Sequence, residues 1–190
     1  MGLPILWQFL RHPRQIGAIA ASSSALSRRV VSDIDLGSAS LILEYGPGTG
    51  ALTKRILERK SPSALFCAIE SNERLAERFR RRFPEVTLFR ETVENVVGII
   101  DDLPKTKVDC IVSGLPWASF DDDLQDRLLD ATHSVLREGG TFVTFAYLTG
   151  LMLRSGKQFR RKLHRRFSRV SRSPVVWWNL PPAIVYRCAR

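Results

Sequence analysis

The stretch LILEYGPGTG, residues 41–50, constrains the fold of this chain more than any other segment. Its first five residues are mostly apolar and predict a buried strand. Glycines occupy positions 46, 48 and 50, and the apolar residues Leu52, Ile56 and Leu57 follow at helical spacing. Glycine permits both tight turns and a close approach of the main chain to a ligand. The pattern therefore predicts either a ligand-binding loop or simply a tight strand-to-helix turn.

Beyond this loop, short apolar runs alternate with longer amphipathic ones. The predicted strands cover residues 64–70, 86–89, 108–115 and 139–147, and the predicted helices cover residues 71–83, 92–103 and 121–138. Strand–helix alternation of this kind builds an α/β fold, with a mostly parallel sheet covered on both faces.

The two ends of the chain follow a different pattern. Residues 151–170 predict a basic helix, or a helix followed by a loop, and residues 173–180 and 182–190 predict an antiparallel hairpin with a Pro-Pro turn. Two further helices are expected near residues 3–12 and 22–33. We therefore expect a single domain over residues 1–190, with N-terminal helices in 1–38, a core in 39–190 and a basic segment in 151–172.

The net charge of +10 is unevenly distributed. Residues 139–190 contain eleven Lys and Arg and no Asp or Glu, which leaves 18 basic and 19 acidic residues in 1–138. A like-charge block repels itself unless an anionic partner is close. Such a partner would be a nucleic-acid phosphate backbone or an anionic membrane surface, and a merely solvated charge run is the alternative.

The cysteines and the apolar runs bear on the compartment. Cys67, Cys110 and Cys188 are far apart in the sequence, and we expect buried, unreactive thiols and no metal site. No apolar run approaches the ~20 residues of a membrane-spanning helix, and no export signal is evident at the N-terminus. These features predict a cytoplasmic protein.

Two carboxylates flank the glycine loop. Glu44 precedes Gly46 by two residues, and Glu70 lies at the end of the second predicted strand, twenty residues after Gly50. The spacing differs from the dinucleotide pattern G-x-G-x-x-G and lacks the Gly-Lys-Ser/Thr ending of a P-loop. A carboxylate at the tip of the second strand suits the two hydroxyls of a ribose.

With these features, residues 40–147 resemble the class I S-adenosylmethionine-dependent methyltransferases. The resemblance implies a Rossmann-like, seven-stranded sheet that is mostly parallel and has an antiparallel C-terminal hairpin. It also implies cofactor contacts by position, from Glu44, Gly46, Gly48, Gly50, Glu70, Ser71, Glu91, Thr92 and Ser113. For two of these a local role is the alternative, because Ser71 could cap a helix and Glu91 could be an acidic residue at a helix N-terminus.

Four motifs in order resemble the bacterial phospholipid N-methyltransferases, which convert phosphatidylethanolamine towards phosphatidylcholine. They are GAIAASSSALS at residues 17–27, LILEYGPGTGALT at 41–53, SGLPW at 113–117 and NLPPAIV at 179–185. Ala21 stands where that family usually has proline. The resemblance implies that Ser22 and Ser23 lie near the cofactor carboxylate, although helix capping alone is an alternative.

The SGLPW motif separates two kinds of acceptor. In adenine amino-group methyltransferases a similar NLPY motif supplies an Asn that accepts a hydrogen bond from the target amine, whereas this chain has Gly114 there, or Ser113 if the loop is one residue longer. The sequence therefore favours a lipid headgroup over RNA adenine. The expected substrate-binding residues are Leu115, Trp117, Tyr147, Arg154 and Asn179, and the candidate catalytic residues are Tyr147 and Ser113.

An aromatic pocket would suit a headgroup that becomes a quaternary ammonium as methyl groups accumulate. Trp117, Tyr147 and one of the adjacent Trp177 and Trp178 are the expected members. Methyl transfer needs an amine lone pair aimed in line at the methyl carbon more than it needs a strong base.

Two segments could attach the protein to the inner face of the cell membrane as a peripheral enzyme. One is the apolar stripe Leu3, Leu6, Trp7 and Leu10, for which packing on the domain is the alternative; the other is the basic segment 151–172. An anionic phospholipid surface is the expected partner, nucleic acid is the rival, and no protein partner is evident. An RNA adenine N6-methyltransferase and a non-catalytic module that binds anionic surfaces remain the alternative functions.

Overall fold

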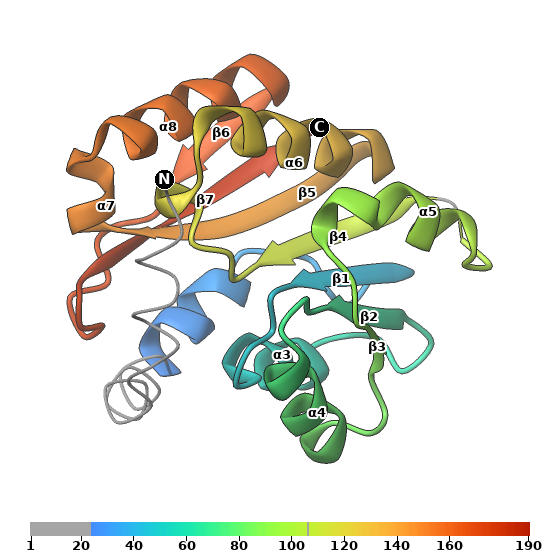
Figure 1. Ribbon diagram of the computed structural model, residues 1–190. Coiled ribbons are helices and arrows are strands. Elements are labelled where there is room, and N and C mark those ends of the chain that lie inside the picture. The colour runs from blue at the N-terminus through green and yellow to red at the C-terminus, as the bar shows by residue number, and fades with distance from the viewer. Residues whose placement is uncertain (1–23, 106) are drawn as a thin grey trace.

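The computed structural model describes residues 24–105 and 107–190, and a seven-stranded sheet runs through them (Figure 1). Its strands lie in the order β3-β2-β1-β4-β5-β7-β6. The bounds are Leu41–Tyr45 for β1, Leu65–Ile69 for β2, Thr87–Phe89 for β3, Val108–Ser113 for β4, Leu136–Tyr147 for β5, Arg169–Arg172 for β6 and Ala183–Ala189 for β7. Strands β1 to β5 pair in parallel, and β7 pairs antiparallel with both β5 and β6. The predicted mixed sheet is confirmed.

Helices cover both faces of this sheet. Beyond residues 24–31, which are also helical, their bounds are Ala51–Leu57 for α3, Glu73–Arg82 for α4, Val96–Asp101 for α5, Asp122–Val135 for α6, Leu148–Met152 for α7 and Arg154–Arg166 for α8. Two short 3-10 turns, Val93–Asn95 and Trp117–Ser119, precede α5 and α6.

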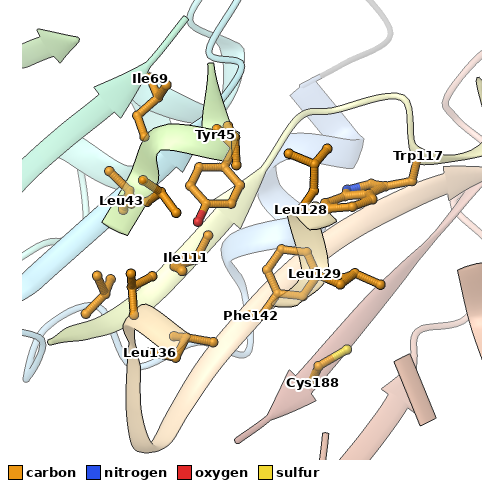
Figure 2. Packing of buried hydrophobic residues seen from close by; sticks show 14 of the residues in the cluster. Leu43, Tyr45, Ile69, Ile111, Trp117, Leu128, Leu129, Leu136, Phe142 and Cys188 are labelled. Carbon is orange, nitrogen blue, oxygen red and sulfur yellow. The ribbon is translucent and has the colours of Figure 1, made fainter. Parts of the chain in front are cut away.

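The alternation of side chains along β1 divides the interior into two cores. Leu41, Leu43 and Tyr45 pack with α5, α6 and α8, and Figure 2 shows Tyr45 in this core near Ile111 and Phe142. Ile42 faces the other way, towards residues 24–31, α3 and α4. Because successive side chains of a strand point to opposite faces, Glu44 lies on the same side as Ile42. The strand thus directs a carboxylate towards α3.

The C-terminal hairpin differs from the prediction. Residues 173–180 form a turn around a single bridge between Val176 and Ala183, and the outer strand β6 comes instead from the basic run before it. Proline has no N–H to donate to a strand ladder, and Pro174, Pro181 and Pro182 bracket the segment. Trp177 and Trp178 consequently occupy a turn and are exposed.

Helix α8 also differs from a freely solvated basic helix. Phe159 and Leu163 on its inner face are buried in the core, and Phe167 follows them there. Lys162, only 6% exposed, pairs with Asp126 of α6 at 2.7 Å. The apolar stripe of the basic segment therefore packs inside the protein, and its outer face alone is available to a partner.

The three cysteines, Cys67, Cys110 and Cys188, are buried, as predicted. Helix α4 is capped by Asn72, whose side chain accepts a hydrogen bond from the Leu75 N–H, and not by Ser71. Within residues 24–105 and 107–190, no helix has the length and apolar character needed to cross a bilayer. The expected helix at 3–12, the stripe Leu3, Leu6, Trp7 and Leu10, and Ser22 and Ser23 lie outside the described residues.

Candidate active site

The three glycines of the loop after β1 have different surroundings. All have left-handed backbones, with φ of 62° at Gly46, 53° at Gly48 and 82° at Gly50. A Cβ on Gly50 would lie 2.0 Å from the Phe83 ring, and one on Gly46 would lie 2.9 Å from Leu115, whereas one on Gly48 would meet nothing within 4 Å among the described residues. Gly46 and Gly50 thus permit close packing within the protein, and Gly48 is the glycine that faces open space.

Glu70 fastens this loop to the neighbouring strand. Its carboxylate accepts hydrogen bonds from the Gly48 N–H at 3.2 Å and from the Asn72 N–H at 3.0 Å. Burial raises the pKa of the Glu70 carboxyl, and these two bonds act in the opposite direction. A carboxylate has about four acceptor positions, so two remain for the hydroxyls of a ligand beside Gly48.

Glu44 is fully buried on the same side of the sheet. Thr53 of α3 donates a hydrogen bond from Oγ1 to Glu44 Oε2 at 2.7 Å, while Glu44 Oε1 has no partner among the described residues. Burial raises the pKa of the Glu44 carboxyl to about 8. A buried carboxyl oxygen without a partner is costly, and a cationic or donor group of a ligand would satisfy it.

A cavity of about 140 Å³ adjoins the glycine loop at the carboxyl ends of β1, β4 and β5. Its walls come from helix 24–31, the loops after β1 and β4, the start of α3, the end of β5 and the turn before β7. They are Leu26, Ser27, Gly46, Pro47, Ala51, Leu52, Gly114, Phe145, Tyr147 and Asn179. In open α/β sheets ligands bind outside the carboxyl ends of the strands, where the strand order reverses, and here it reverses between β1 and β4.

The SGLPW motif builds the second wall of this cavity. Gly114 donates its N–H to the Tyr45 carbonyl at 2.8 Å, and a Cβ at this position would lie 2.7 Å from the Gly46 carbonyl oxygen. There is thus no room for an Asn side chain at position 114 with this backbone. The close contact between the two loops explains the glycine.

Two expected site residues in this motif have structural positions instead. Trp117 is 2% exposed and stacks on Phe159 with ring centroids 4.8 Å apart, so it belongs to the core and not to an aromatic headgroup pocket. Its Nε1 donates to Ser113 Oγ at 3.0 Å. The Ser113 hydroxyl also accepts from the Leu115 N–H at 3.3 Å, so it positions the loop and is not placed to act on a substrate.

Tyr147 and Asn179 both line the cavity, the first from the end of β5 and the second from the turn before β7. Tyr147 ends β5 and packs edge-on against Phe145 at 5.6 Å between ring centroids. Burial raises the pKa of the Tyr147 hydroxyl, which disfavours a role as a proton-accepting tyrosinate. Asn179 is 1% exposed; its Nδ2 donates to the Pro181 carbonyl at 2.6 Å, and its Oδ1 has no partner among the described residues.

The remaining expected residues lie outside this cavity. Glu91 is exposed and accepts a hydrogen bond from Asn95 at 2.8 Å, and Thr92 caps the following 3-10 turn through the Glu94 N–H. Ser71 is exposed between Glu70 and the Asn72 cap, and Arg154 is exposed at the start of α8. The sequence reading did not single out Thr53 or Phe145. Thr53 stands within the motif quoted for the loop, and that is the one signal that could have revealed it.

These residues fit S-adenosylmethionine. Glu70 has acceptor positions for a ribose, Glu44 Oε1 has no partner among the described residues and suits an amino group, and Gly48 faces open space. With the strand order β3-β2-β1-β4-β5-β7-β6, they define a class I S-adenosylmethionine-dependent methyltransferase. When bound, that cofactor supplies an electrophilic methyl group on a sulfonium.

Comparison with known proteins leads to the same class. Residues 42–140 match the methyltransferase domain family, and the chain belongs to this family. An ornithine lipid N-methyltransferase from Singulisphaera acidiphila is 31% identical over 186 residues, which are 96% of this chain and 93% of that protein. Ribosomal RNA small subunit methyltransferase A from Parasynechococcus marenigrum is 34% identical over 105 residues, which are 53% of this chain and 33% of that protein.

Solved structures share the fold at low identity. Magnesium protoporphyrin IX methyltransferase from Synechocystis with bound SAM superposes with a TM-score of 0.66 and 12% identity, over 90% of this chain and 80% of that one. An O-methyltransferase from Bacillus cereus in complex with SAH gives 0.67 and 15%, over 93% and 88%. The family match and the relative over 96% of the chain, together with this fold, make the protein an S-adenosylmethionine-dependent methyltransferase.

Proposed function

We propose that the protein methylates the amine of a membrane-lipid headgroup. The observation that carries the proposal is the buried Oδ1 of Asn179, an acceptor that has no partner among residues 24–105 and 107–190 and lies at a cavity that also includes Gly46 of the cofactor loop. An amine nitrogen at this place could donate one N–H to Asn179 and direct its lone pair towards the methyl group. Adenine methyltransferases use an amide oxygen from the SGLPW position for this purpose, and here that position is Gly114.

Methyl transfer does not require a strong base from the protein. The headgroup ammonium would first lose a proton to water, which frees the amine lone pair. S-adenosylmethionine, held by Glu44, Gly48 and Glu70, would supply the methyl group to that lone pair. The protein must exclude other nucleophiles and hold the two reactants in line, and correct positioning supplies a large part of the rate. The Tyr147 ring offers a π face to the ammonium, and this attraction increases in value when the cation is desolvated.

Full-length similarity supports a lipid over RNA. The relative named for ornithine lipid matches 96% of the chain, whereas the ribosomal RNA methyltransferase matches 53% of it. Phosphatidylethanolamine, the substrate expected from the motifs, and ornithine lipid both carry an aliphatic amine. The shared chemistry is therefore an amine beside an anionic headgroup.

The test is a transfer assay with methyl-labelled S-adenosylmethionine. Purified protein is incubated separately with vesicles that contain phosphatidylethanolamine, with vesicles that contain ornithine lipid, with amine-free vesicles and with small-subunit ribosomal RNA. We expect label in one or both amine lipids and none in the amine-free vesicles. Labelled RNA with unlabelled lipids would overturn the proposal in favour of an RNA adenine methyltransferase.

A substitution at Asn179 tests the assigned contact. Asn179→Ala should lower kcat on the lipid by roughly 10- to 100-fold, because a hydrogen bond to a charged group is worth about 1.5–3 kcal/mol. Its affinity for S-adenosylmethionine should match that of the unaltered protein, since the Asn179 side chain is not among the expected cofactor contacts. A variant with unchanged kcat would remove Asn179 from the reaction.

A further inference from the structure

Exposed large apolar side chains are concentrated in one region of this protein. Among the described residues they are Val97, Met152, Leu153, Trp177, Trp178 and Leu180. All except Val97 lie on two short segments, one of them α7 with the residue after it and the other the turn before β7. Trp178 is 88% exposed and Met152 is 78% exposed, which is unusual for such large apolar groups on a protein surface.

The two segments leave the sheet at the same point. Tyr147, the last residue of β5, pairs with Ala183, the first residue of β7. Leu148 donates its N–H to the Pro182 carbonyl at 2.9 Å, so α7 begins where the turn ends. Figure 1 shows both at the left-hand edge of the molecule, at the arrowhead of β5, while α5, with Val97, lies at the opposite edge.

The same two segments border the cavity of the proposed acceptor site. Tyr147 and Asn179 line the cavity beside the glycine loop. Asn179 is buried, but its neighbours Trp178 and Leu180 are exposed, so a short turn connects the cavity wall with the apolar surface. A molecule that contacts this surface is therefore adjacent to the proposed acceptor site.

Unpaired positive charge adjoins these apolar groups. Residues 139–190 contain no acidic side chain, and Arg154 and Lys157 at the start of α8 are exposed. Lys162 and Arg166 on the inner face of α8 are occupied by Asp126. On the outer face, Lys157, Arg160, Arg161, His164 and Arg165 line a shallow hollow, and none of them has an ion pair within the part of the chain that the structure describes.

We propose that Met152, Leu153, Trp177, Trp178 and Leu180 form a docking surface that enters the headgroup layer of an anionic lipid bilayer. The identity of the partner rests on the proposed function, because a lipid substrate must reach the cavity from a bilayer. Tryptophan partitions favourably to the headgroup boundary, aliphatic groups reach slightly deeper, and basic neighbours attract anionic lipids. Nucleic acid would match the arginines and the tryptophans, but would offer nothing to the exposed Met152, Leu153 and Leu180.

The test is a flotation assay that needs no methylation. Vesicles of phosphatidylglycerol and phosphatidylcholine, which carry no methylatable amine, are mixed with the full-length protein. The double substitution Trp177→Ser/Trp178→Ser should weaken vesicle binding at least roughly tenfold, since two large aromatic surfaces are no longer removed from water. Val97→Ser is the matched control, as an exposed apolar residue at the opposite edge, and should bind like the unaltered protein. Equal binding by all three proteins would overturn the proposal.

Two further measurements exclude misfolding and separate this proposal from the proposed function. The double variant should retain its affinity for S-adenosylmethionine and its activity on a short-chain, water-soluble amine lipid, and should lose activity only on vesicles. In a Trp7→Phe background, vesicles should shift the tryptophan emission to the blue. The shift would report on Trp177 and Trp178, because the one other tryptophan of the sequence, Trp117, is already buried. If the tryptophans bind vesicles and no lipid is methylated, the proposed function is wrong and the proposed docking surface is supported. If the double variant loses binding to ribosomal RNA and not to vesicles, the surface serves RNA and the proposal is wrong.

Discussion

Thr53 donates a hydrogen bond to the fully buried carboxyl of Glu44 at 2.7 Å, and the second oxygen of that carboxyl has no partner among the described residues. Helix α3 thus fixes the Glu44 side chain of β1 through one oxygen, and the other oxygen is left for a ligand. The same burial raises the pKa of Glu44 from 4.5 to about 8.

This pKa makes stability depend on pH. Between pH 4.5 and 8 the unfolded chain has an ionised Glu44, whereas the folded protein keeps it protonated, so the folded state binds the extra proton and loses stability as pH rises. Without cofactor, the free energy of unfolding should fall by on the order of 3 kcal/mol from pH 5 to pH 8. Glu44→Gln should remove this slope in urea denaturation measured across that range. Parallel pH profiles for the two proteins would contradict the prediction.

Glu70 should control cofactor affinity. Its carboxylate holds the Gly48 N–H and has acceptor positions left for a ribose. Glu70→Ala should weaken S-adenosylmethionine binding roughly 10- to 100-fold in titration calorimetry, as expected when a charge-assisted hydrogen bond is lost. Glu77→Ala, which changes an exposed acid on α4, is the control and should leave the affinity unchanged.

Gly48 and Gly50 should respond to substitution in different ways. Gly50→Ala places a Cβ 2.0 Å from the Phe83 ring and should cost about 2–4 kcal/mol in unfolding free energy, from overpacking and left-handed strain together. Gly48→Ala meets no neighbour within 4 Å in the part of the chain that the structure describes, and should cost only about 1 kcal/mol of backbone strain. Its methyl group would nevertheless occupy the open space for the cofactor, so its main effect should be lost affinity. If calorimetry shows normal binding by Gly48→Ala, the cofactor does not lie over this residue.

The Tyr147 ring should matter more than its hydroxyl. Burial raises the pKa of this phenol, so it stays protonated at neutral pH and contributes no basic limb to the rate. Tyr147→Phe should retain kcat/KM within a few-fold, and Tyr147→Ala should lose roughly 3- to 30-fold, the value of a desolvated cation–π contact of about 0.5–2 kcal/mol. Steady-state rates from pH 6 to 9 would measure both. A large loss in Tyr147→Phe would instead assign a function to the hydroxyl.

The ion pairs between α6 and α8 should contribute to the stability of the fold and not to catalysis. Asp126 accepts hydrogen bonds from Lys162 and Arg166, each at 2.7 Å, and these partners lower the pKa of its carboxyl. Asp126→Ala should cost about 1–3 kcal/mol in unfolding free energy, because the nearly buried Lys162 loses a partner. Cofactor affinity should remain unchanged. The pKa of Asp126 is lower in the folded protein than in the unfolded chain, so its carboxylate stabilises the fold only while it is ionised. This stabilisation should disappear as pH falls below the ordinary pKa of an aspartate.

Local sequence predicted much of the fold. Apolar runs and the glycine loop indicated β1 to β5 and the helices between them, because a buried face requires apolar residues at the spacing of a strand or a helix. The antiparallel C-terminal pairing was predicted correctly, but its outer strand was assigned to the wrong segment, residues 173–180. Val175 to Trp178 have strong strand propensity, yet three neighbouring prolines prevent a ladder there, and the less regular run 169–172 pairs with β7 in its place.

The sequence by itself determined the class of the protein, since the positions of Glu44, the glycines and Glu70 depend on short spacings along the chain. Only the tertiary structure decided which side chains face the cavity. Trp117 carries an aromatic ring at the right motif position, but packing against Phe159 and the bond to Ser113 turn it into the core. Asn179 lies 62 residues after Trp117 and reaches the cavity because β7 pairs antiparallel with β5. Side-chain orientation and long-range pairing depend on contacts between distant segments, and no local pattern contains them.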